Sequence, residues 1–144
     1  MSLGPLASLN GFVPFPSNSL WNTDIYNAPV DSNSANFINY IGANTTLHPD
    51  FGSGKYAGSS IGIPYQIESA AQPKVNVKLT DYATQSDPGP MPVPANALIE
   101  GFPHPDDGDR HVLVLDQGGC WLYELYYAHL KNGAWSASSS AIWI

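Results

Sequence analysis

The strongest constraint on this chain is a pair of apolar segments on either side of Gly118-Gly119, within the stretch GDRHVLVLDQGGCWLYELYYA at residues 108–128. In each segment the side-chain types repeat with the two-residue period of a β-strand. The glycine pair supplies the kind of tight turn that connects two antiparallel strands. We therefore predict a β-hairpin around which the rest of the domain is organised.

The length of the turn decides which residues of the hairpin face one another. A two-residue loop at the glycines, or a four-residue loop over residues 117–120, places Leu113 opposite Glu124 and His111 opposite Tyr126. A three-residue loop would shift every pair and move each side chain to the other face. We predict the first register.

In that register the side chains divide between two faces of the hairpin. The first face carries Asp109, His111, Leu113, Leu115, Cys120, Leu122, Glu124 and Tyr126. The second face carries Val112, Val114, Asp116, Trp121, Tyr123, Leu125 and Tyr127. The first face is apolar near the turn and ionisable at the open end, so we predict the functional site at the open end.

Chemistry at the open end would depend on His111, Glu124 and Tyr126. Diagonal neighbours on one sheet face lie about 7–8 Å apart, which places Glu124 near His111. A carboxylate beside a half-buried imidazole orients its tautomer for catalysis or metal binding. Glu124 is flanked by leucines, an environment that favours a protonated general acid. The alternative is a solvent-facing ion pair next to a tyrosine with a satisfied hydroxyl.

A second catalytic carboxylate would come from Asp109 or Glu100. Asp109 lies one same-face step beyond His111, and Glu100 follows an apolar run at residues 97–99 that we predict to be a strand. Two carboxyl groups about 5–10 Å apart are the requirement for hydrolysis of a glycosidic bond.

Metal binding has less support from the sequence. His48, Asp50, His104 and His111 are candidate ligands, but their spacing matches no zinc motif. The acidic segment at residues 99–111 imitates a calcium loop without the glycine and glutamate positions of an EF-hand. We therefore expect no metal and no other cofactor.

The second hairpin face is rich in aromatic residues. Trp121, Tyr123 and Tyr127 would bind substrate if they formed an exposed platform on which sugar rings stack. They would otherwise be part of the hydrophobic core, which is the commoner fate of such residues.

Composition and pattern together predict a mainly β fold. Hydrophobic residues make up 43% of the 144 residues, charged residues only 12%, and glycine and proline number 13 each. This composition favours turns over helix interiors. We predict one β domain over residues 1–144, a sandwich or partly open barrel with one short helix.

Several segments outside the hairpin have a predicted conformation. The prolines of residues 1–20 predict an extended arm with apolar anchors. Asp31 to Ile41, with Asp31 as N-cap and Gly42 after the end, predicts the helix. We predict an edge strand at residues 61–67, interrupted by Pro64, and a half-buried strand at residues 75–79. Residues 86–97 predict a proline-rich crossing, and residues 134–144 one or two strands.

Charge and hydropathy exclude two classes of partner. The net charge is −7, and the five basic residues are scattered: Lys55, Lys74, Lys78, Arg110 and Lys131. A surface of this kind does not bind nucleic acid or anionic membranes, and no apolar run approaches the length of a membrane span. It suits neutral or cationic ligands, although an acidic surface can serve solubility alone.

A set of ordered motifs resembles a pattern in uncharacterised secreted proteins of soil bacteria. The motifs are SLWNTDI, LHPDFG, IGIPY, SDPGPMPVPANALIEG, GDRHVLVLD and CWLYELY, over about residues 15–143. The resemblance implies an extracellular location and does not indicate which activity the protein has. Proteins with this pattern are longer, and the chain has an apolar end at Ile144 and no signal peptide, so we expect a fragment of a longer protein.

Two functions from different classes follow. The first is a secreted carbohydrate-active enzyme, a glycoside hydrolase on a β-glucan-type polysaccharide, with Glu124 as general acid. In that enzyme Asp109 or Glu100 is the second carboxylate, and His111 and Tyr126 orient the reacting groups. The second is a non-catalytic carbohydrate-binding or cell-surface module that uses the aromatic residues as a platform.

Overall fold

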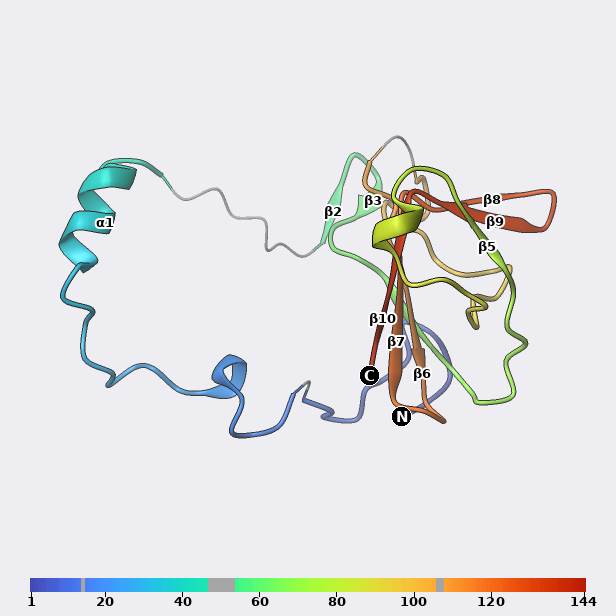
Figure 1. Cartoon of the computed structure of the whole chain (residues 1–144), viewed down its shortest axis with the longest axis horizontal. Helices are drawn as coiled ribbons and strands as arrows, with labels where there is room; N and C mark the ends of the chain where they lie inside the picture. Colours follow the sequence, from blue (N-terminus) through green and yellow to red (C-terminus); the bar gives the residue numbers. More distant parts are fainter. Residues whose placement is uncertain (14, 47–53, 106–107) are drawn as a thin grey trace. The chain divides into compact units, whose positions relative to one another are not determined.

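The computed structural model describes residues 1–13, 15–46, 54–105 and 108–144. The chain divides into two compact units, one of Met1–Asn10 with Phe51–Ile144 and one of Gly11–Asp50. Every described strand belongs to the first unit (Figure 1). The protein is mainly β, as its composition predicts.

The larger sheet of the first unit has the strand order β1-β4-β6-β7-β10. Its strands are β1 (Gly4–Pro5), β4 (Tyr65–Glu68), β6 (Val112–Asp116), β7 (Trp121–Tyr126) and β10 (Ser139–Trp143). Strands β4 and β6 are parallel, and the other neighbours are antiparallel.

Two smaller sheets complete the first unit. One has the order β5-β9-β8, from β5 (Val77–Leu79), β8 (His129–Lys131) and β9 (Ala134–Ala137). The other is a hairpin of β2 (Lys55–Tyr56) and β3 (Ser59–Ser60). Within the described residues no sheet closes into a barrel, and the arrangement is consistent with the predicted sandwich-like fold.

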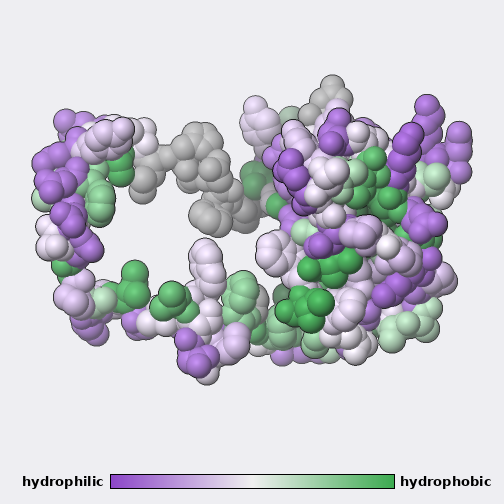
Figure 2. Space-filling model, in the orientation of Figure 1, coloured by the Kyte–Doolittle hydropathy of each residue, from purple (hydrophilic) through white to green (hydrophobic). Residues whose placement is uncertain are grey.

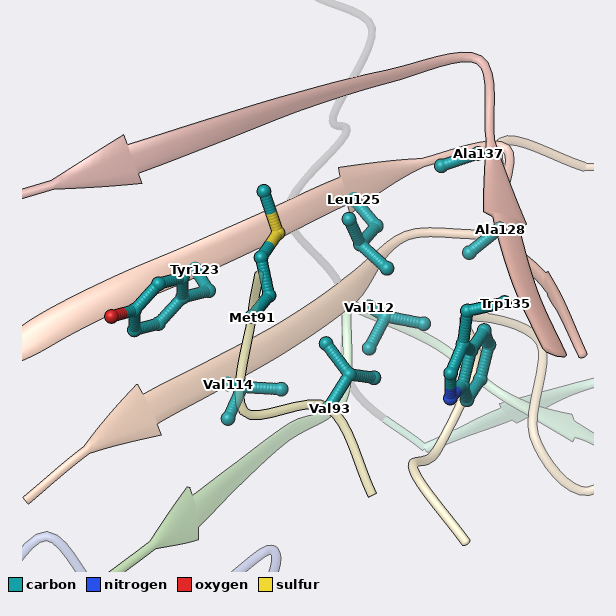
Figure 3. Packing of buried hydrophobic residues seen from close by; sticks show 9 residues of the cluster. All are labelled: Met91, Val93, Val112, Val114, Tyr123, Leu125, Ala128, Trp135 and Ala137. Carbon is teal, nitrogen blue, oxygen red and sulfur yellow. The ribbon is translucent and has the colours of Figure 1, made fainter. Parts of the chain in front are cut away.

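The hydrophobic core lies on the second face of the β6–β7 hairpin. Val112, Val114, Tyr123 and Leu125 are almost completely buried there, as strict alternation predicts. Figure 3 shows Met91 and Val93 over these strands and Trp135 of β9 beside Val93. Val75, Val77 and Leu79 pack against the same cluster, so the predicted half-buried strand at residues 75–79 is confirmed in β5 and the bridge before it.

The predicted register of the hairpin is confirmed. Leu113 lies opposite Glu124, and the last pair before the turn joins Asp116 to Trp121. The connection is the four-residue loop at residues 117–120 rather than a two-residue turn.

Two strand predictions before the hairpin are wrong. The strand expected at residues 61–67 begins only at Tyr65, after the proline, and lies between β1 and β6 rather than at the sheet edge. The short β1 covers that edge, where Leu6 N donates to Tyr65 O at 2.9 Å. The strand expected at residues 97–99 does not form, although Ala97 and Ile99 still pack on the core.

The end of the chain forms the two strands that its pattern allows, β9 and β10. A 3₁₀-helix, η2 (Ala83–Gln85), precedes the proline-rich crossing, which runs without regular structure apart from a bridge at Met91. Met91, Pro92 and Val93 in this crossing are buried. Their burial gives the crossing a role in the core as well as a connecting one.

The second unit contains a 3₁₀-helix, η1 (Leu20–Asn22), and the helix α1 (Ser34–Ile41). The helix begins later than predicted because Asp31 Oδ1 accepts a hydrogen bond from Asn33 N at 2.7 Å, which closes a turn before the first helical residue. It ends at Ile41, and Gly42 follows as the C-cap with a φ of 101°.

Few side chains of the second unit are covered. No residue of α1 is buried, and Phe37 is 59% exposed. The apolar anchors predicted between residues 12 and 20 are exposed as well, and hydrophobic side chains are visible along this segment in Figure 2. None of the described helices is long and apolar enough to cross a membrane.

The two hairpin faces should differ in their contribution to stability. Leu125→Ala removes a side chain that is 0% exposed, so the free energy of unfolding should fall by about 2–5 kcal/mol. The matched change Leu122→Ala, on the half-exposed first face, should cost clearly less. Urea unfolding followed by circular dichroism measures both, and equal losses would contradict the assignment of the faces.

Candidate functional site

The open end of the β6–β7 hairpin departs from the regular ladder. Tyr127 N donates to Asp109 O at 2.8 Å and Ala128 N to Arg110 O at 3.1 Å, which is not the strand register. Arg110 and Tyr127 have φ values of 54° and 53°, a conformation that non-glycine residues seldom adopt. Strict alternation of side chains therefore ends at Val112 and Tyr126. Counting alternate residues no longer predicts on which face of the hairpin the Asp109 side chain lies.

His111 is paired with Glu100, not with Glu124. Its Nδ1 lies 2.7 Å from Oε2 of Glu100, and its backbone N donates to the same oxygen at 3.2 Å. In return Glu100 N donates to His111 O at 2.9 Å. Three contacts thus join the two residues, and the Glu100 carboxylate is held in one orientation.

The other predicted neighbour of His111 is in place. The rings of His111 and Tyr126 lie 5.4 Å apart between centroids, with 50° between their planes. Arg110 ties the adjacent loop to the sheet, since Nε donates to Ala128 O at 3.0 Å and Nη1 to Pro105 O at 3.0 Å. The residues that precede β6 therefore contact both the β7 end of the hairpin and the loop at Pro105.

Glu100 and Asp109 line one cavity of about 430 Å³, which we call the Glu100 cavity. Its described walls are Tyr56, Ala57, Ser59, Ser60, Ile61, Gly62, Glu100, Gly101, His104, Gly108 and Asp109. The β2–β3 hairpin supplies one wall, and the turn after Glu100 with the start of the β6 segment supplies the other. The carboxylates of Glu100 and Asp109 and the imidazole of His104 thus line the same open cavity.

Glu124 lies in a different place from the other predicted carboxylates. With Tyr126 it lines a smaller hollow of about 270 Å³, together with Gln85 and residues 139–141. Its Oε2 accepts a hydrogen bond from Trp143 Nε1 at 3.3 Å, which compensates the carboxylate on this otherwise apolar arm. Glu124 and Asp109 therefore line different hollows, and the structure does not bring these two predicted carboxylates together at one cavity.

The aromatic residues of the second face do not form an open platform. Tyr123 is 1% exposed, and its hydroxyl accepts from Lys74 Nζ at 3.2 Å. Trp121 is half-buried against the core, with Lys74 Nζ 5.6 Å from its ring centre. Tyr127 is exposed, and its ring centroid lies 4.8 Å from that of His129, with 77° between the two planes. Tyr123 therefore has no ring face to offer to a sugar.

The metal candidates are not gathered in the part of the chain that the structure describes, where no three potential ligands form a group. His104 lines the Glu100 cavity, and His111 is bonded to Glu100. His48 and Asp50 lie outside the described residues.

Two carboxyl groups with shifted pKa values lie away from the cavity. Hydrogen bonds from the hydroxyls of Thr80 and Ser138 lower the pKa of the Asp81 carboxyl. Burial raises the pKa of the Glu68 carboxyl at the end of β4. Glu68 lies opposite Asp116 in the parallel pair, so both groups belong to the turn end of the sheet.

Sequence reasoning missed the β2–β3 hairpin that walls the cavity. Its turn residues Ala57 and Gly58 have φ values of 50° and 87°, as a primed two-residue turn requires. The signal in the sequence is the glycine at the second turn position between two short polar strands.

The contact between His111 and Glu100 should contribute measurably to the free energy of unfolding. His111→Phe keeps a ring beside Tyr126 but removes the donor to Glu100, so the free energy of unfolding should fall by about 1–2 kcal/mol. The same change in a Glu100→Gln background should cost less, because the amide is a weaker acceptor. Equal costs in both backgrounds, measured by urea unfolding, would mean that the two residues are not coupled.

Glu68 should make stability depend on pH. A group whose pKa is raised on folding contributes stability that is complete below its unfolded pKa and is lost as pH rises through the folded value. Glu68→Gln stays neutral, so its melting temperature should exceed that of the wild type at pH 7. The difference should vanish near pH 3, below the ordinary glutamate pKa of about 4.3. Thermal melts at the two pH values test this, and a constant difference would contradict it.

Comparisons with known proteins add no family to this description. No protein-family model, curated protein or solved structure gives a significant match to the chain. The physical case for a function therefore rests on the side chains of the Glu100 cavity.

Proposed function

We propose that the protein is a secreted carbohydrate-active enzyme, a glycoside hydrolase that acts on a β-glucan-type polysaccharide with Glu100 and Asp109 as its paired carboxylates. The observation that carries the proposal is the placement of both groups on one open cavity, with Glu100 held by His111. A pair of carboxyl groups flanking the scissile bond is what most glycoside hydrolases require.

The two carboxylates differ in how they are held. Oε2 of Glu100 accepts both hydrogen bonds from His111, and within the described residues nothing donates to Oε1. Asp109 is exposed, and no described donor reaches its carboxylate. Glu100 is thus the oriented group that attacks the sugar as nucleophile or takes a proton from the attacking water as base. Asp109 is the general acid that gives a proton to the leaving oxygen and regains one from water.

The cavity has a size and charge that suit a neutral sugar chain. Its volume of about 430 Å³ falls in the range of small-molecule sites, about 300–1,000 Å³. Its described walls contain no lysine or arginine, and the two carboxylates disfavour an anionic group such as a uronate or a phosphate. Serine hydroxyls and backbone groups on the hairpin side can bind sugar hydroxyls.

Glu100→Gln and Asp109→Asn should each reduce the release of reducing sugar from β-glucan by about 100-fold or more, as for loss of a general acid or base. Both groups are at least partly exposed, so the circular dichroism spectrum should be kept in both variants, and Glu100→Gln should lose no more stability than the His111 contact supplies. The matched control is Glu124→Gln, in the other hollow, which should keep most of the activity.

The outcomes separate the possible sites. Loss of activity in Glu124→Gln with normal activity in Glu100→Gln would move the reaction to the smaller hollow. Wild-type protein that binds β-glucan and never releases sugar would make it a binding module and refute the enzyme.

A further inference from the structure

One aromatic side chain borders the Glu100 cavity without any role in the core. Tyr56 on β2 lines the cavity and is 79% exposed. Among the described lining residues it is the one phenylalanine, tyrosine or tryptophan, and it takes part in none of the described ring contacts. Packing of the fold therefore does not explain an aromatic residue at this position.

The hairpin that carries Tyr56 is tied to the segment that carries Glu100. Ser60 N donates to Phe102 O at 2.9 Å, and Ser59 Oγ donates to His104 O at 3.4 Å. These bonds join β3 to the turn that follows Glu100. Because β2 pairs with β3 over a two-residue turn, the backbone that carries Tyr56 belongs to the same cavity wall as these bonds.

We propose that Tyr56 is the stacking residue of the site, which holds a glucosyl ring against its face and so positions the sugar chain next to Glu100 and Asp109. This inference rests on the proposed function. A β-linked glucose ring presents apolar C–H groups on its faces and hydroxyls around its edge. An aromatic face covers the former while the edge groups remain free to reach carboxylates and serines.

The chemistry of this arrangement separates binding from reaction. Tyr56 contributes an apolar face to the bound sugar in both ground state and transition state, and it carries no proton in the reaction. Loss of such uniform binding raises KM and leaves kcat nearly unchanged. Loss of Glu100 or Asp109 should have the opposite signature, with kcat reduced.

The test measures binding without turnover. Calorimetric titration of Glu100→Gln protein with cellohexaose and with laminarihexaose gives the Kd of the β-1,4- and β-1,3-linked glucose hexamers. Tyr56→Ala added to the Glu100→Gln protein should raise the Kd of the bound hexamer about tenfold. Tyr56→Phe, which keeps the ring, should change this Kd less than about twofold. Tyr82→Ala is the matched control, since Tyr82 is an exposed tyrosine that lines neither hollow and should leave the Kd unchanged.

Steady-state kinetics on otherwise wild-type protein complete the test. Tyr56→Ala should raise KM about tenfold with kcat within about twofold. Unchanged Kd and KM in Tyr56→Ala would overturn the role of Tyr56 and leave the hydrolase proposal intact. A wild-type protein that neither binds nor cleaves either hexamer would overturn both, and binding with no cleavage would overturn the hydrolase alone.

Discussion

The contact between Gly118 and Ala70 is the constraint on which both faces of the hairpin depend. A Cβ atom at Gly118 would lie 2.4 Å from the Cβ of Ala70, so no larger residue fits there without a shift. Asp116 Oδ1 accepts hydrogen bonds from Gly118 N at 2.8 Å and Gly119 N at 3.4 Å, which closes the turn from its first strand. A four-residue turn held in this way fixes which residues of β6 and β7 lie opposite one another, and so which side chains share a face of the hairpin. This register decides which side chains of the two strands form the core.

The sequence predicts those parts of the fold whose signals are local. Alternation and a glycine turn specify the β6–β7 register, and the periodicity of residues 75–79 specifies a strand, because each depends on neighbours within a few positions. The β4 strand was misplaced because its neighbours come from far along the chain. Its outer edge pairs with Gly4–Pro5, and no pattern within residues 61–67 predicts this pairing.

The candidate site was predicted in part for the same reason. Register correctly brings Tyr126 beside His111, with 5.4 Å between ring centroids. Register alone also suggested Glu124, since a diagonal neighbour lies about 7–8 Å away. A loop residue can approach more closely than a diagonal one, and Glu100 does so at 2.7 Å. Which carboxylate pairs with the imidazole was decided by the path of residues 101–110, and that path carries no periodic signal.

Irregular backbone at the open end is what separates the site from the core. Beyond Val112 the left-handed residues Arg110 and Tyr127 shift the ladder, so the chain before β6 leaves the sheet and forms a wall of the cavity. Glu100 stays attached to the sheet through His111, and the β2–β3 hairpin stays attached to the Glu100 turn through Phe102 O. The carboxylate is thus positioned by a residue that directly precedes β6, while turns and the short β2–β3 hairpin surround it. Support from a packed element is the arrangement that gives a reacting group a defined position.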